Sequence, residues 1–197
     1  MVTFLEPDDL APFLASDALI QSDDITVTTL ARELRSQHPS DTAFARASFE
    51  WVRDRIGHSY DVQDPRVTLS ASEVLGEGVG LCYAKSVLLA ALLRAEGIPA
   101  GLSYQRLGDA TDGFVVHGLV AIWLDGAWHR QDPRGNRPGL DAQFSLGDEL
   151  LAYRIDQSRG ERDYPELYSA AAPEVVATLS AATNVLTTPL PADLGAR

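Results

Sequence analysis

The sequence contains one cysteine among its 197 residues, Cys82, so no internal disulfide can form. It also contains no basic run with interleaved aromatic residues, and acidic residues outnumber basic ones by 28 to 16, giving a net charge of −12. Such a chain is repelled by phosphate backbones and anionic lipid, which disfavours nucleic acid and membrane surfaces as partners. The acidic excess is expected mainly to keep the protein in solution.

Long apolar segments are missing as well. The longest apolar run, residues 87–93, is much shorter than the roughly 20 residues that a transmembrane helix needs. Residues 1–10 include Glu6, Asp8 and Asp9 and no basic residue, so they do not resemble a signal peptide. A cytoplasmic location is the default expectation.

Metal and nucleotide motifs are also absent. The sequence has no H-E-x-x-H and no C-x-x-C motif, and the glycines of residues 76–80 have the spacing of neither a P-loop nor a dinucleotide fingerprint. No repeat occurs at a period of 20–50 residues. The sequence therefore predicts no metal and no cofactor, and a single domain over residues 1–197.

Helical patterns occupy the N-terminal part and the centre of the chain. A weak helix is predicted over residues 26–37, and Ser40 or Asp41 can cap a second helix that Gly57 ends. Residues 81–96 are apolar nearly all round, which is typical of a helix in the middle of a fold. Strands are predicted over residues 99–107, 114–124 and 127–132, an Ala-rich helix over 164–183 and an irregular end over 187–197.

Cys82 falls in the first turn of the predicted central helix. It is either a buried structural cysteine, a common fate for this residue type, or a nucleophile. A helix N-terminus stabilises an anion by about 0.3–1 kcal/mol, up to about 2, whereas activating a thiol takes about 3 kcal/mol. A nucleophilic Cys82 would therefore need a second contribution, and a nearby imidazolium is the natural one.

The dipeptide Asp125-Gly126 predicts a two-residue hairpin turn, which sets the register of the flanking strands. Trp123 then faces Trp128, and His117 becomes a diagonal neighbour of Asp132 on the same face of the sheet. The carboxylate would orient the imidazole, as in other nucleophile–base–orienter sets. Alternatively, His117 is a satisfied sheet histidine and Asp132 caps the turn at Pro133.

The other histidines are weaker candidates. His129 points to the opposite face, and His38 is expected to be solvated in a loop. His58, just after a helix, could reach a cleft, although a surface position is the favoured expectation. Tyr60, Gln63 and Gln131 could donate to an oxyanion, but the sequence gives no geometry to choose among them. Trp128 could shape a substrate cleft, although sheet packing is the simpler interpretation.

Several segments together resemble the transglutaminase-like superfamily. They are Gly80-Leu81-Cys82-Tyr83-Ala84, residues 92–100 and residues 128–135, with weaker likeness over residues 51–56 and 70–75. The resemblance implies an α+β, papain-like transglutaminase core: a central helix bearing the cysteine packed on an antiparallel β-sheet, with N-terminal helices and a C-terminal helical extension. Residues 1–60 would be the N-terminal helical part, 61–135 the catalytic core and 136–197 the extension.

The resemblance also implies that Cys82, His117 and Asp132 match the family's catalytic positions. The protein would be a cysteine peptidase or amidase, or alternatively a transglutaminase, acting on a peptide or protein substrate through a thioester intermediate. One departure is that His117 is followed by residues 118–121, Gly-Leu-Val-Ala, where family members often have an aromatic and then an acidic residue. This change affects the expected substrate-facing surface and leaves the three catalytic positions in place.

Two further hypotheses stay open at this stage. The chain could be a catalytically silent transglutaminase-like module that binds a peptide or protein partner. It could also be a scaffold that assembles through its Ala-rich C-terminal helix. The reactivity of Cys82 distinguishes an enzyme from a binding module, because an activated thiolate reacts below the pH range of a free thiol.

Overall fold

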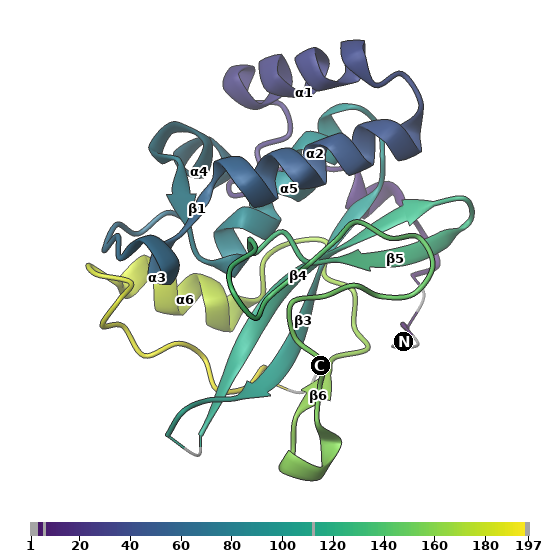
Figure 1. The fold of residues 1–197 in the computed structure, drawn as a ribbon. Coiled ribbons are helices and arrows are strands. Elements are labelled where there is room, and N and C mark those ends of the chain that lie inside the picture. Colours follow the sequence, from purple (N-terminus) through teal and green to yellow (C-terminus); the bar gives the residue numbers. More distant parts are fainter. Residues whose placement is uncertain (1–3, 6, 112, 196–197) are drawn as a thin grey trace.

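A buried helix and a four-stranded antiparallel sheet form the centre of the molecule, and the other helices lie around them (Figure 1). The computed structural model describes residues 4–5, 7–111 and 113–195, so the expectations for residues 1–10 and 187–197 lie partly outside the described residues. The elements, in chain order, are η1 (Ala11–Phe13), α1 (Ile25–Gln37), α2 (Asp41–Arg55), β1 (Gly57–His58), α3 (Ser59–Val62), α4 (Ala71–Glu77), β2 (Val79–Gly80), α5 (Cys82–Ala95), β3 (Ala100–Gly108), β4 (Phe114–Leu124), β5 (Ala127–Gln131), η2 (Gln157–Arg159), β6 (Arg162–Asp163) and α6 (Pro173–Ala181).

The two N-terminal helices begin at side-chain caps. The Asp24 carboxylate accepts hydrogen bonds from the backbone N–H groups of Thr26 and Val27 at the start of α1. The Ser40 hydroxyl accepts one from Ala43 N–H at the start of α2. Both caps satisfy N–H groups that have no partner within the helix, and both predicted helices are confirmed.

Helix α5 is the central helix that the sequence predicts. Every residue from Cys82 to Arg94 is buried. Helices α1, α2 and α4 contact it, and strands β3 and β4 contact it as well. A helix that is apolar nearly all round is stable only when it is enclosed in this way.

The sheet has the strand order β5-β4-β3-β6. Asp125 and Gly126 both have positive φ angles, 53° and 79°, as the two-residue hairpin turn requires. The predicted register is confirmed, with Trp123 opposite Trp128. Pairing between β4 and β5 ends at Val120 and Gln131, so β4 extends beyond its neighbour and leaves its edge available to other groups.

The C-terminal region differs from the predicted helix over residues 164–183, since α6 covers only Pro173–Ala181. Residues 164–168 run along β3 instead: Tyr164 N–H donates to Tyr104 O at 3.1 Å and Tyr168 N–H to Leu102 O at 3.0 Å. Pro173 occupies the start of the helix, where its missing N–H is not needed. The alanines that favour a helix begin at Ala170, whereas residues 164–168 contain Pro165 and pair with the sheet.

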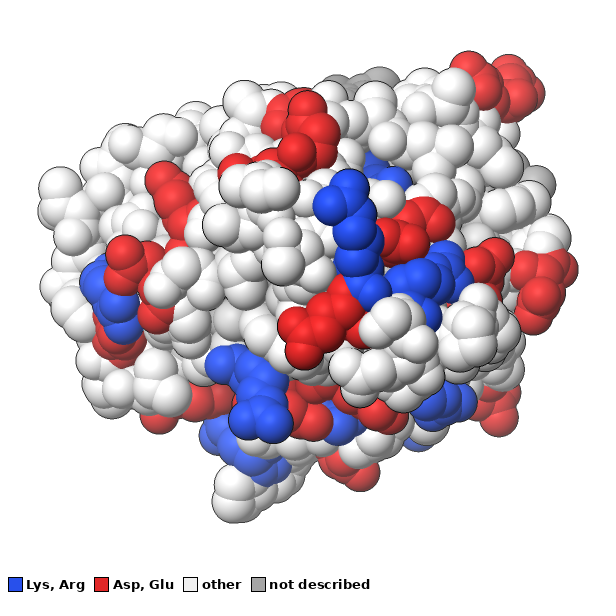
Figure 2. Space-filling model, turned by 90° about the horizontal axis from the view of Figure 1, so that it is seen from above, with Lys and Arg blue, Asp and Glu red and all other residues white. Residues whose placement is uncertain are grey.

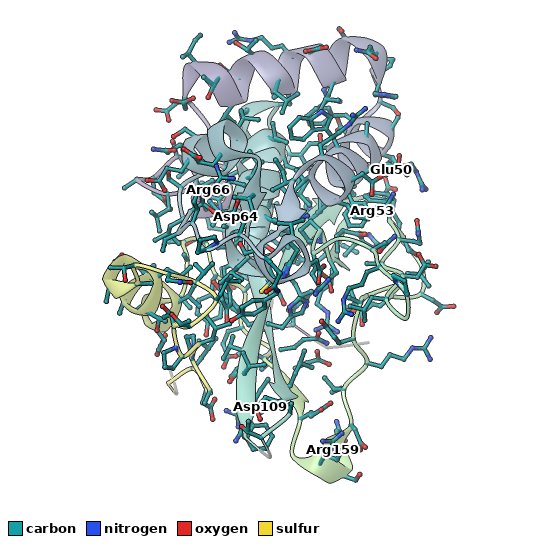
Figure 3. All side chains as sticks on the ribbon, turned by 60° about the vertical axis from the view of Figure 1, so that its left-hand side comes forward. Glu50, Arg53, Asp64, Arg66, Asp109 and Arg159 are labelled. Atoms are coloured by element: carbon teal, nitrogen blue, oxygen red, sulfur yellow. The ribbon has the colours of Figure 1, made fainter. Side chains whose placement is uncertain are left out.

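Charged side chains of both signs are interspersed on the face seen from the α1 side (Figure 2). The Arg35 guanidinium of α1 lies 2.9 Å from the Asp41 carboxylate of α2, and the Arg53 guanidinium lies 2.7 Å from the Asp54 carboxylate within α2. At the other end of the molecule, Asp109 and Arg159 lie near the tip of the sheet (Figure 3). In the part of the chain that the structure describes, no helix has the length and apolar character needed to span a bilayer. The expected cytoplasmic location stays a prediction.

Candidate active site

Cys82 is the first residue of α5 and is 7% exposed. The preceding residue, Leu81, provides no side-chain cap, so the first N–H groups of the helix are not satisfied by a capping side chain and favour an anion at this position. The backbone N–H of Gly118 donates to the Cys82 Sγ atom at 3.4 Å. The sulfur therefore lies between a helix N-terminus and the edge of β4.

Gly118 makes this close approach possible. The hairpin register directs its N–H toward the side of β4 that β5 no longer covers. A Cβ atom at Gly118 would lie 2.9 Å from Tyr83 Cδ1 and 3.2 Å from Tyr83 Cα. The absence of a side chain at Gly118 thus lets the first turn of α5 lie directly against β4.

His117 and Asp132 are directly bonded, with 2.8 Å between His117 Nε2 and Asp132 Oδ2. Asp132 is 0% exposed, and its carboxylate also accepts hydrogen bonds from Arg134 N–H and Ala152 N–H, both at 3.1 Å. Burial acts to raise the pKa of Asp132, but the imidazole and these hydrogen bonds outweigh it and lower the pKa below its ordinary value. The carboxylate is therefore ionised in the fold.

His117 connects this carboxylate to the thiol. Burial acts to lower the pKa of His117, but Asp132 and then Cys82 outweigh it and hold the pKa well above its ordinary value. The Tyr153 ring packs edge-on against the imidazole, with 5.0 Å between ring centroids. Thiol, imidazole and carboxylate thus form one continuous set, contributed by α5, by β4 and by the residue that follows β5.

A cavity of about 230 Å³ lies beside the Cys82 sulfur. Leu107, Val115 and Leu190 give it an apolar side. The C-terminal segment is held there because Val116 N–H donates to Pro191 O at 2.7 Å, again on the open edge of β4. The remaining lining residues are His58, Tyr60, Leu81, Gly108, Val116, His117, Arg134, Tyr153, Arg154 and Glu161.

The structure brings one of the four secondary candidates to this cavity. Tyr60 lines it, and burial followed by Cys82 raises the pKa of its phenol. Gln63, Gln131 and Trp128 do not line it. The Gln63 amide donates to Tyr60 O at 2.6 Å. The Gln131 amide is bonded to the backbone of Ser145 through both its nitrogen and its oxygen, at 2.6 and 3.2 Å.

Trp128 and Gln131 lie away from the cavity for two different reasons. Successive strand side chains point to opposite faces, so Gln131 points away from the face that Asp132 shares with His117. Trp128 packs against Trp123, with ring centroids 5.5 Å apart, and against Phe13 at 5.0 Å. Contacts with the N-terminal segment, which periodicity does not reveal, turn this tryptophan into a packing residue.

His58 is the clearest correction among the histidines. Its expected surface position is wrong, because the side chain is 7% exposed and lines the cavity. Strand β1 pairs with β2 in parallel and places His58 opposite Gly80, two residues before Cys82. The short parallel pair is a long-range contact, and no local pattern around residue 58 signals it.

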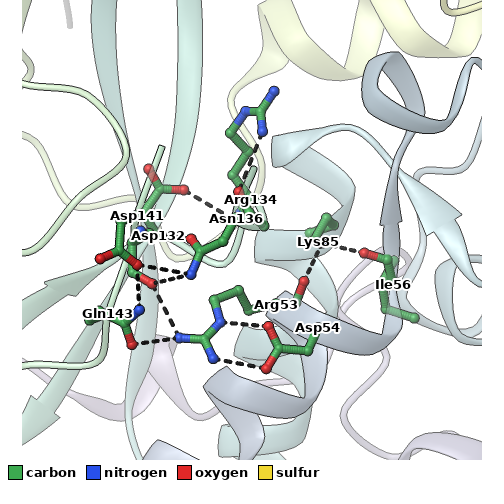
Figure 4. Close-up of polar contacts among 11 residues, drawn as sticks. Arg53, Asp54, Ile56, Lys85, Asp132, Arg134, Asn136, Asp141 and Gln143 are labelled. Atoms are coloured by element: carbon green, nitrogen blue, oxygen red, sulfur yellow. Dashed lines mark hydrogen bonds and ion pairs between the residues drawn. The ribbon is translucent and has the colours of Figure 1, made fainter. Parts of the chain in front are cut away.

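Arg134 and Lys85 are charged side chains near the site, and each is held by hydrogen bonds of its own. The Arg134 guanidinium binds both carboxylate oxygens of Asp61, at 2.8 and 3.0 Å. Lys85 is fully buried and donates to the main-chain oxygens of Ile56 and, at 3.2 Å, of Arg53, near the end of α2 (Figure 4). Burial, followed by the charge of Arg134, lowers the pKa of Lys85 to about 7.

The described residues contain no group of three or more His, Cys, Asp or Glu side chains arranged to hold a metal ion. The acid–base set of Cys82, His117 and Asp132 is instead suited to nucleophilic attack on a carbonyl carbon. The imidazole can take and return a proton, and the buried carboxylate stabilises the imidazolium.

Comparisons with known proteins identify the superfamily and the fold. The family model described as the transglutaminase-like superfamily matches residues 28–133, and no curated protein matches the sequence. Among solved structures, the chain is similar to a putative cysteine protease from Cytophaga hutchinsonii, with a TM-score of 0.52 and 20% identity over 66% of this chain and 43% of that one. The periplasmic domain of TgpA from Pseudomonas aeruginosa gives a TM-score of 0.47 and 21% identity over 65% of this chain and 49% of that one. The matches thus cover less than half of either structure, and the first of them shows the fold alone.

Proposed function

Because the chain belongs to the transglutaminase-like superfamily, we propose that it is a thiol-dependent enzyme that transfers the acyl group of a peptide or amide bond. Cys82 is the nucleophile, His117 the base and then the acid, and Asp132 the residue that orients His117. The observation that supports this proposal most directly is the 2.8 Å contact between His117 Nε2 and the fully buried Asp132. That contact leaves the other ring nitrogen for Cys82.

In the proposed reaction the Cys82 sulfur attacks the carbonyl carbon and the π electrons move onto the oxygen. When the carbonyl re-forms, the bond to the leaving nitrogen breaks and the amine takes a proton from His117. The product is a thioester on Cys82. Water, deprotonated by His117, then releases the acid, whereas an amine in place of water would give transfer.

Hydrolysis is the preferred outcome in this proposal, because water is abundant and the sequence shows no site for a second substrate. A peptide or protein is the proposed substrate class, in keeping with the family. The cavity beside the sulfur has room for a side chain or a short segment of such a substrate, with apolar residues on one side.

The test uses the fact that Cys82 is the only cysteine, so any thiol adduct reports on this position alone. Iodoacetamide is expected to label the protein nearly as fast at pH 6 as at pH 8, because the reactive form is a thiolate paired with an imidazolium. With p-nitrophenyl acetate, intact-mass measurement should reveal an acetyl adduct that then hydrolyses. Cys82→Ala should give neither adduct.

A silent binding module would behave differently in the same experiment. Its thiol would react much faster at pH 8 than at pH 6, as a free cysteine does, and p-nitrophenyl acetate would give no turnover. That result would rule out the enzymatic proposal.

A further inference from the structure

His58 is buried, yet one polar atom of its side chain has no partner in the fold. The side chain is 7% exposed, and its Nδ1 atom has no hydrogen-bond partner. Its ring packs against that of Tyr60, with 5.8 Å between centroids. Buried polar atoms in folded proteins are nearly always hydrogen-bonded, so an unpartnered one calls for an explanation such as a ligand that completes the site.

The position of His58 is close to where the chemistry would occur. Its backbone pairs with Gly80, which directly precedes the helix N-cap and Cys82. The imidazole lines the same cavity as the Cys82 sulfur and His117. The charged groups that act on it are Arg134, Asp61, Lys85 and His117.

Two of the charged side chains that line the cavity are already engaged. Arg134 is bound to Asp61 through two hydrogen bonds. Glu161 accepts from the backbone N–H groups of Gly108 and Asp156, at 3.0 and 2.7 Å. Tyr60 is 37% exposed, so this residue is less secluded from solvent than His58, which is 7% exposed.

The His58 ring is neutral at neutral pH. Burial, followed by the charge of Arg134, lowers the pKa of His58 to about 3. A neutral imidazole carries one N–H donor, and it does not compete with His117 for the catalytic proton. A neutral histidine of this kind can polarise a carbonyl oxygen, as is known from other enzymes.

We propose that His58 is the side-chain donor of the oxyanion hole, acting together with the backbone N–H of Cys82. This inference rests on the proposed thioester chemistry. As the Cys82 sulfur bonds to the acyl carbon, the carbonyl π electrons move onto the oxygen, and the His58 N–H donates a hydrogen bond to it. The electrons return when the leaving group departs with a proton from His117, so His58 itself transfers no proton.

The experiment compares two reactions of Cys82 in wild-type protein and in His58→Phe, which keeps a ring beside Tyr60 but has no donor. Acylation by p-nitrophenyl acetate passes through an oxyanion, whereas alkylation by iodoacetamide does not. We expect the acylation rate to fall about 100-fold or more, with the alkylation rate changing less than threefold. His38→Phe is the matched control, since His38 lies between α1 and α2, and both rates should stay unchanged.

Two further variants cover the case in which His58→Phe does not fold, as judged by circular dichroism. His58→Gln keeps a neutral N–H donor, and its acylation rate should stay within about tenfold of wild type, while His58→Leu should lose as much as the Phe variant. Equal acylation by wild type and a folded donor-free variant overturns the inference about His58 alone. An absence of any acyl adduct on wild-type Cys82 would instead overturn the proposed function.

Discussion

The Nε2 atom of His117 lies 2.8 Å from Oδ2 of Asp132, across the end of the β4–β5 hairpin. This contact selects the tautomer of the imidazole, because the nitrogen bonded to the carboxylate carries a proton and Nδ1 becomes the atom that faces the chemistry. Two backbone N–H groups, of Arg134 and Ala152, fix the carboxylate in turn. The orienting residue is therefore itself oriented.

Asp132→Asn tests this relationship. The amide keeps the shape of the side chain but can neither stabilise an imidazolium nor enforce the same tautomer, so we expect kcat for p-nitrophenyl acetate to fall about 10²–10⁴-fold. Initial rates measure the effect. Asp125→Asn is the matched control, because Asp125 lies in the hairpin turn at φ 53°, a conformation that asparagine accepts. A fall of less than threefold in Asp132→Asn would show that the carboxylate does not orient the imidazole.

Gly118→Ala tests the close approach of β4 and α5. The added Cβ would lie within 3.3 Å of the Tyr83 backbone, so α5 must shift, and we expect a loss of about 1–3 kcal/mol in the free energy of unfolding together with most of the thiol reactivity. Gly76→Ala is the matched control, since nothing lies within 4 Å of its added Cβ and it lies in helix α4.

In that control, alanine should stabilise the protein by about 0.5–1 kcal/mol. Denaturant unfolding of both variants measures the difference. If Gly118→Ala were as stable as wild type, the proposed contact between Tyr83 and β4 would not constrain the site.

Lys85 provides a prediction about pH. It is the only lysine in the chain, so protein labelled with ¹³C at lysine Cε should give a single side-chain resonance. We expect this resonance to titrate near pH 7, because burial and Arg134 lower the pKa of Lys85 to about 7. A titration near the ordinary value of 10.5 would contradict the buried environment.

The lowered pKa of Lys85 also makes the free energy of unfolding depend on pH. Between pH 7 and 10.5 the unfolded chain holds the Lys85 proton and the folded chain does not, so stability rises with pH across this window. Below pH 7 Lys85 is protonated in both the folded and the unfolded chain, and the full cost of burying its charge lowers the stability. Relative to Lys85→Met, the free energy of unfolding of the wild type should therefore rise by about 1.4 kcal/mol per pH unit within the window. Parallel curves for the two proteins would contradict the assignment.

Tyr153 covers the imidazole, and its contact with His117 is through the ring rather than the hydroxyl. Tyr153→Phe should keep this contact and wild-type activity, whereas Tyr153→Ala should lower kcat/KM about 2- to 10-fold, the effect of losing about 0.5–1.5 kcal/mol of ring packing. Steady-state kinetics with p-nitrophenyl acetate distinguish the two. Equal losses in both variants would show that the hydroxyl, not the ring, matters.

The amino-acid sequence by itself determined the local features of this protein. The caps at Asp24 and Ser40, the Asp-Gly turn and the apolar central helix each depend on residues that are neighbours in the chain, so their geometry follows from backbone sterics and periodicity. Because the turn sets the strand register, the sequence also determined that His117 and Asp132 share a face. The apolar run that follows Cys82 likewise placed this residue at the start of a helix.

Only the tertiary structure decided what surrounds these residues. His58 reaches the cavity through a two-residue parallel pair, and Tyr153 reaches His117 from an irregular segment. Residues 164–168, at the start of the predicted C-terminal helix, pair with β3 instead. Contacts of this kind join segments that are distant in sequence, and their energy comes from burial and from hydrogen bonds that form only once the chain is packed.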